Sequence, residues 1–113
     1  MKLYYYILPM GKEPQSIIRT KECEVEKCGS GYRPVQGCFP IGYNMTPGAI
    51  GTLKVSTIGY EKIYVATQEP DLDLAKRLFI QNINERIESH KKRIELLEGI
   101  RTAIETKGET RAW

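Results

Sequence analysis

The last third of the chain carries an apolar repeat with helical spacing, and this repeat constrains the fold more than any other feature. Pro70-Asp71 marks a helix start, because aspartate is a preferred N-cap residue and the helix dipole favours negative charge in the first turn. Apolar residues then recur at helical intervals, at Leu72, Ala75, Phe79, Ile83, Ile87, Ile94, Leu97 and Ile104. This spacing predicts one long helix over residues 71–107, with a break or kink expected near Gly99 and an end at Gly108.

From Ile80 onward the repeat also fits a heptad. One column holds Ile80, Ile87, Ile94 and Arg101, and the other holds Ile83, His90, Leu97 and Ile104. Residues 71–98 alone would extend about 42 Å at 1.5 Å per residue, whereas a domain of this size is roughly 35 Å across. The helix must therefore overhang a sheet, turn back near Gly99, or pack against a partner. Two interpretations stay open: a helix that covers one face of a small sheet, and a homodimer formed through the C-terminal helix.

The first 70 residues are rich in strand signals. Lys2–Leu8 and Ser16–Lys21 predict two strands separated by a turn that contains proline and glycine, with Cys23–Val25 as a continuation of the second strand. Leu53–Ile58 and Lys62–Thr67 predict a hairpin with Gly59 in its connection. Residues 29–59 hold seven of the ten glycines and three of the six prolines, without a regular period. The expected fold class is therefore α+β, with a small antiparallel sheet, an irregular segment rich in glycine and proline, and a long C-terminal helix.

Length and composition predict one domain in the cytoplasm. A chain of 113 residues fits a single domain over 1–113, which we expect to be β-rich over 1–70 and helical over 71–107. The apolar N-terminus is too short for a signal peptide. No apolar run approaches the roughly 20 residues that cross a bilayer, so we expect no membrane contact. In the cytoplasm the cysteines would stay reduced.

Three cysteines lie close together in the sequence, and the chain has a single histidine. Cys23 and Cys28 are followed by Cys38, and His90 lies in an apolar column of the predicted helix. Structural zinc normally takes four ligands, so we predict a zinc site formed by Cys23, Cys28, Cys38 and His90. Two alternatives stay open. The cysteines can be small buried hydrophobic residues, with His90 in a core or dimer interface, or they can have a redox or disulfide role.

The residues that common enzyme chemistries need are missing. A single histidine excludes multi-histidine metal catalysis, and the chain has neither a phosphate-binding glycine loop nor a dinucleotide fingerprint. Lysine and arginine are interleaved with acidic residues, and the net charge is only +3. A nucleic-acid binder usually has a strong basic excess on one face. We therefore expect a non-enzymatic protein with a protein partner. A zinc-stabilised regulator that binds nucleic acid through Arg33 and Lys91–Arg93 stays the alternative.

Tyrosines are the candidate partner-binding residues. Tyr4 and Tyr6 share one side of the first predicted strand, whereas Tyr32, Arg33 and Tyr43 lie in the irregular segment. Exposed tyrosine and arginine are preferred anchors of protein interfaces. The alternative is that the tyrosines flank the sheet edges and cover the core.

Several segments give the chain a family resemblance. They are the tyrosine-rich Met1–Leu8, the step Gly31-Tyr32-Arg33, and the run Lys62–Thr67 that leads into Ala75–Phe79. In these the chain resembles small accessory proteins of phages and prophages of Gram-positive bacteria. Within that group it is similar to anti-CRISPR proteins that inhibit Cas9, including a type that carries structural zinc.

The resemblance implies stoichiometric inhibition in the cytoplasm of the host cell. The protein would bind a Cas9-type effector and block guide loading, target-DNA loading or nuclease movement. Many such inhibitors mimic DNA with a dense acidic surface, and the balanced charge of this chain departs from that pattern. The expected contact is therefore with a protein surface of the effector.

Overall fold

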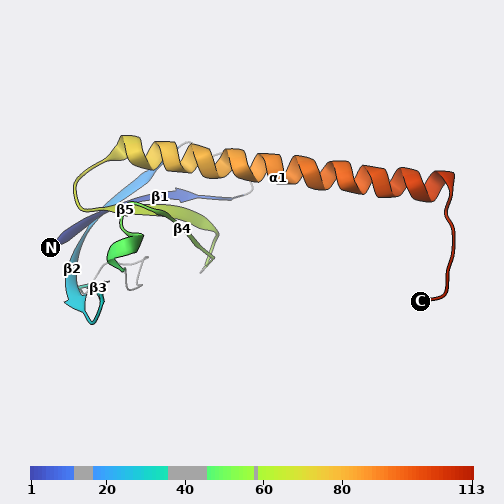
Figure 1. Ribbon diagram of the computed structural model, residues 1–113. Coiled ribbons are helices and arrows are strands. Elements are labelled where there is room, and N and C mark those ends of the chain that lie inside the picture. Colours follow the sequence, from blue (N-terminus) through green and yellow to red (C-terminus); the bar gives the residue numbers. More distant parts are fainter. Residues whose placement is uncertain (12–16, 36–45, 58) are drawn as a thin grey trace. The chain divides into compact units, whose positions relative to one another are not determined.

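A five-stranded antiparallel sheet and one long helix make up the fold (Figure 1). The computed structural model describes residues 1–11, 17–35, 46–57 and 59–113. The strands in these ranges are β1 (Lys2–Pro9), β2 (Arg19–Cys28), β3 (Gly31–Pro34), β4 (Leu53–Ser56) and β5 (Lys62–Thr67). A short 3-10 helix, η1 (Pro47–Ala49), precedes β4, and helix α1 (Leu72–Thr106) follows β5. The predicted α+β class is confirmed.

The first strand of the chain lies at the centre of the sheet, in the order β3-β2-β1-β5-β4. Leu3 of β1 lies opposite Cys23 of β2, and Tyr5 lies opposite Ala66 of β5. The predicted hairpin is confirmed, because β4 pairs antiparallel with β5. β2 begins at Arg19 rather than at Ser16, and it continues through Cys23–Val25 to Cys28.

Strand β3 was not predicted, because it lies within the glycine- and proline-rich segment. It pairs antiparallel with the end of β2, with Cys28 opposite Gly31. The tight turn between them depends on Gly29, whose φ of 61° lies in the left-handed region that glycine adopts without steric cost. Only four residues long and ending in Pro34, β3 is a typical edge strand.

The two faces of the sheet are covered by different parts of the chain. On the face that we call the loop side, buried residues of β1, β2 and β5 cluster with Ala49 of η1: Leu3, Tyr5, Ile7, Cys23, Val25, Tyr64 and Ala66. Alternation along the strands places Tyr6, Leu8, Ile63 and Val65 on the opposite face, which we call the helix side, and all four are buried. The first turns of α1 lie along this face, and their Ala75 and Phe79 are buried as well (Figure 1).

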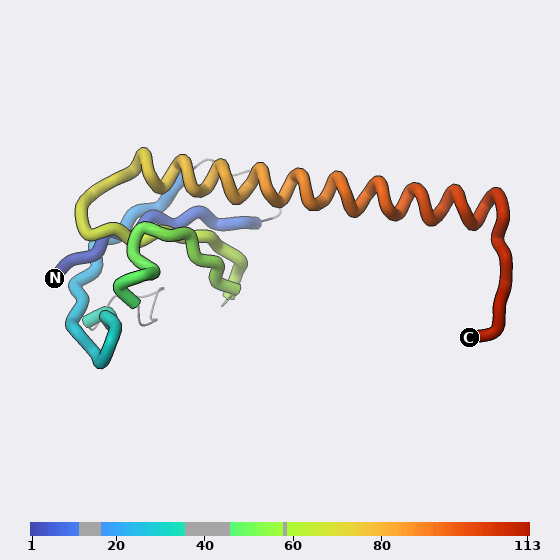
Figure 2. Tube along the Cα trace, viewed as in Figure 1, coloured from blue at the N-terminus to red at the C-terminus, as the bar shows by residue number. Residues whose placement is uncertain are grey.

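Asp71 anchors the start of α1 through two hydrogen bonds, one from its side chain and one from its backbone. The Oδ1 atom of Asp71 accepts a hydrogen bond of 3.1 Å from the backbone N–H of Leu74, which confirms the predicted N-cap. The backbone N–H of Asp71 in turn donates to the hydroxyl of Tyr6 at 2.8 Å. Figure 2 follows the short connection from β5 into the helix at this point.

The helix runs without interruption from Leu72 to Thr106, so the prediction of a break or kink near Gly99 is wrong. An exposed glycine weakens a helix by about 1 kcal/mol relative to alanine, which the surrounding turns tolerate. The predicted end is confirmed at Gly108, whose φ of 50° is the left-handed conformation typical of helix C-termini.

The described chain divides into two compact units, and the boundary between them lies inside α1. Met1–Phe79 form the sheet unit, and Ile80–Trp113 form the helical unit. In the helical unit Asn82, Ile83 and Arg86 are half-buried, and every other residue is exposed. The division lies inside α1 because only its first turns contribute buried side chains.

Candidate functional site

The helical unit exposes a row of large apolar side chains. Ile80, Ile87 and Ile94 are 59%, 47% and 54% exposed, and Leu97 and Ile104 are 49% and 65% exposed. Together with the half-buried Ile83 these residues occupy both predicted heptad columns, so they lie along one side of the helix. We call Ile80, Ile83, Ile87, Ile94, Leu97 and Ile104 the apolar stripe.

The stripe is a candidate protein interface for a physical reason. Most helices in proteins are stabilised by packing of an apolar face rather than by intrinsic propensity, and Ile80–Thr106 contain no buried residue. Extended rows of exposed apolar side chains mark interaction surfaces. Two polar residues interrupt the stripe at regular positions: His90 and Arg101, both of them exposed.

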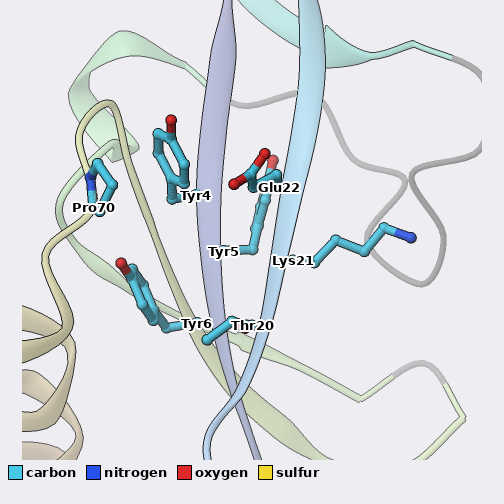
Figure 3. Close-up of a pocket in the computed structure, with 7 residues that line it drawn as sticks. All are labelled: Tyr4, Tyr5, Tyr6, Thr20, Lys21, Glu22 and Pro70. Carbon is cyan, nitrogen blue, oxygen red and sulfur yellow. The ribbon is translucent and has the colours of Figure 1, made fainter.

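A second candidate site is a shallow groove on the helix side of the sheet (Figure 3). It measures about 280 Å³ and is lined by Tyr4, Tyr5, Tyr6, Thr20, Lys21, Glu22 and Pro70. Figure 3 shows the rings of Tyr4 and Tyr6 on the side of β1 that is nearer to Pro70. Tyr4 is half-buried, whereas Tyr6 is only 6% exposed and its hydroxyl is engaged by Asp71. Tyr4 is therefore the residue of this pair that a partner can reach.

The structure does not bring all predicted anchors together. Tyr32 is half-buried against the core cluster on the loop side. Arg33 is exposed, and its Nε donates to the Oε1 of Glu26 at 2.7 Å. This hydrogen bond with the carboxylate raises the pKa of the Arg33 guanidinium. Tyr43 lies outside the described residues.

Sequence reasoning missed a ladder of ion pairs beside the groove. Glu22, Glu24 and Glu26 alternate along β2 and share one face, a spacing that was visible in the sequence. Their carboxylates lie 3.6 Å from Lys2 Nζ, 2.8 Å from the N-terminal ammonium and 2.7 Å from Arg33 Nε, respectively. The hydrogen bond from that ammonium lowers the pKa of Glu24. Each carboxylate faces a cation, so this surface carries no dense charge of either sign.

The predicted zinc site needs three reduced cysteines, and Cys23 is not reduced in this structure. Cys23 is 1% exposed and is disulfide-bonded, to a partner that is not among the described residues. Cys28 is a free, half-buried thiol, and Cys38 lies outside the described residues. Within the described ranges, no group of three His, Cys, Asp or Glu side chains could hold a metal ion.

A disulfide and a zinc–thiolate bond exclude one another at Cys23, because only the thiolate is a metal ligand. The disulfide also differs from the expectation that the thiols stay reduced. The predicted zinc site with Cys38 and His90 therefore stays a prediction for the reduced protein.

Comparison of the chain with protein-family models, curated proteins and solved structures found no match. No helix in the described parts of the chain is long and apolar enough to cross a membrane.

Proposed function

We propose that this chain is a non-enzymatic protein that acts by binding other proteins, with the helical unit as an association element. The observation that carries the proposal is the apolar stripe. Apart from the half-buried Ile83, each of its residues exposes about half or more of its surface to water. Burial of such side chains contributes roughly 1.5–3 kcal/mol each when it is complete. A protein partner is therefore the occupant that gains most from this surface.

We propose further that the partner of the sheet unit is a host defence effector, and that the chain inhibits a Cas9-type nuclease. The support for this target is the resemblance to phage and prophage accessory proteins. The ion-pair ladder on β2 is consistent with it, because a self-neutralised surface fits a protein surface better than a nucleic-acid channel. The half-buried ring of Tyr4 in the groove is the anchor that we assign to this contact.

A DNA-cleavage assay tests the inhibitor proposal. Guide-loaded Cas9-type nucleases of several subtypes are mixed with a slight excess of the purified chain, and cleavage of target DNA is followed over time. We expect one subtype to lose most of its activity at a stoichiometric ratio. Unchanged cleavage in every subtype would contradict inhibition of this effector class.

A matched pair of tyrosine variants tests the assigned anchor. Tyr4→Ala should weaken inhibition about tenfold or more, since interface tyrosines often contribute at least 1–2 kcal/mol. Tyr60→Ala is the control, because Tyr60 is half-exposed but is not part of this groove. Equal losses in both variants would argue against the groove. A mobility shift of DNA or RNA at low salt would instead support the nucleic-acid-binding alternative.

A further inference from the structure

We propose that the helical unit pairs with a second copy of this chain as a parallel, in-register, two-stranded coiled coil over residues 80–104. This inference rests on the proposed function, because it names the occupant of the apolar stripe. The heptad places Ile80, Ile87, Ile94 and Arg101 at the a positions and Ile83, His90, Leu97 and Ile104 at the d positions. Six of these eight residues are large and apolar, as a coiled-coil seam requires.

The two polar seam residues decide the orientation. In a parallel, in-register pair each seam residue faces its own counterpart, so His90 faces His90 and Arg101 faces Arg101. The remaining six layers are then purely apolar. A full antiparallel overlap of the same segment would place Arg101 against Ile83 and His90 against Ile94. Polar residues would then face isoleucine in four of the eight layers, so only four layers would be purely apolar instead of six.

The polar layers also favour two strands over more. Isoleucine at both a and d positions tends to give trimers or tetramers, whereas a polar residue in the seam sets the oligomeric state at some cost in stability. In a dimer the long side chain of Arg101 can extend from the edge of the seam into water. A larger bundle would enclose it.

Residues that flank the seam form one attractive and one repulsive charge pair. In a parallel dimer a g residue faces the e residue five positions later on the other helix. Arg93 therefore faces Glu98 of the second copy, and symmetry forms this ion pair twice. Arg86 faces Lys91 of the second copy, which is the one repulsive pair. Gly99 and Lys92 both occupy f positions, on the outer side of the helix, so the glycine leaves no gap in the seam.

A pair of equally exposed residues tests the seam. Ile94 is 54% exposed and lies at an a position, whereas Leu96 is 53% exposed and lies at a c position off the seam. Sedimentation equilibrium of the full chain at micromolar concentration should give twice the monomer mass. Ile94→Asp should weaken the dimer about a hundredfold, because it places two carboxylates in the seam, and Leu96→Asp should leave the dissociation constant nearly unchanged. Equal effects of the two substitutions would overturn the proposal.

A charge reversal tests the orientation. Lys91→Glu replaces the repulsive contact with two Arg86–Glu pairs in a parallel dimer, and we expect about fivefold tighter association. Lys92→Glu makes the same charge change on the outer side and should have no such effect. In the antiparallel alignment residue 91 lies near its own counterpart, so Lys91→Glu would exchange one repulsion for another. No tightening relative to Lys92→Glu would overturn the parallel arrangement.

The mass of the chain separates this proposal from the proposed function. A trimer or a monomer at tens of micromolar would overturn the two-stranded coiled coil. If the parent chain is a monomer that blocks the nuclease, and the Ile94→Asp variant does not block it, the dimer is overturned. The proposed function is then supported, with the effector as the occupant of the apolar stripe. A dimer that inhibits no effector would support the coiled coil and contradict the inhibitor proposal.

Discussion

Two neighbouring tyrosines in β1, Tyr5 and Tyr6, differ in what their buried hydroxyls contact. Tyr5 and Tyr6 point to opposite faces of the sheet, and both are buried. The hydroxyl of Tyr6 accepts a hydrogen bond from Asp71 and so ties the central strand to the start of α1. The hydroxyl of Tyr5 is buried with no hydrogen-bond partner in the described structure. Burial, with a smaller contribution from Tyr64, raises the pKa of Tyr5 above its ordinary value of 10.0.

Removal of the two hydroxyls should therefore have different effects on stability. Tyr6→Phe should lower the free energy of unfolding by about 1 kcal/mol, because the backbone N–H of Asp71 loses its hydrogen bond with the Tyr6 hydroxyl. Tyr5→Phe should leave stability unchanged or raise it by up to about 1 kcal/mol. Urea denaturation of both variants measures the difference, and a larger loss for Tyr5→Phe would contradict this account.

The raised pKa of Tyr5 also predicts a pH dependence. The folded protein holds the phenolic proton more tightly than the unfolded chain, so this contribution to stability is present below about pH 10. It is lost as the pH rises towards the folded-state pKa, because the unfolded chain ionises first. Tyr5→Phe should remove this part of the alkaline loss of stability, and Tyr6→Phe should serve as the comparison.

At the scale of elements, the glycine inside α1, Gly99, and the glycine that follows its end, Gly108, have opposite roles. At Gly99 an added Cβ would meet nothing within 4 Å, whereas at Gly108 it would lie 2.8 Å from the backbone oxygen of Ile104. The φ of 50° at Gly108 also disfavours any residue with a side chain. One glycine therefore only weakens the helix, and the other is required to end it.

Alanine substitutions should separate these roles. Gly99→Ala should stabilise the helix by about 1 kcal/mol, and Gly108→Ala should destabilise its end by about 1 kcal/mol. Thermal unfolding followed by far-ultraviolet circular dichroism measures both changes. The account fails at Gly99 if the substitution lowers the melting temperature.

For the whole molecule, the oxidation state of the cysteines decides which bond Cys23 makes. Cys23 is a buried member of the core cluster and is disulfide-bonded, and a disulfide typically stabilises a fold by 2–4 kcal/mol. Zinc binding by the reduced protein would stabilise the same region by a different bond, with the thiolates as ligands. The oxidised and reduced forms therefore have different expected metal contents.

Mass spectrometry and elemental analysis test both forms. The non-reduced protein should be lighter than the reduced chain by two hydrogens and should carry one thiol, Cys28, that reacts with iodoacetamide. After reduction in the presence of zinc and removal of the excess, about one equivalent of zinc should remain and should be lost in Cys28→Ser. Retention of zinc in His90→Ala would remove His90 from the predicted ligands, and no zinc in the reduced parent would end the zinc prediction.

Much of the fold was predictable because its signals are local. The helix start at Asp71, the helical spacing and the hairpin of β4 and β5 all depend on residues within a few positions of one another. The heptad columns likewise follow from sequence spacing alone. A four-residue strand such as β3 has no comparable signal, because its ends are set by pairing with β2 rather than by its own composition.

Tertiary structure alone decided the rest. The central place of β1 between β2 and β5 and the bond between Tyr6 and Asp71 join residues far apart in the chain. It also separated Tyr32 from Tyr4, which the sequence had grouped as anchors. Hydrophobic periodicity reports which side of an element seeks burial, but not which other element covers it. That choice depends on the packing of the entire chain, and so does the number of copies that pack together.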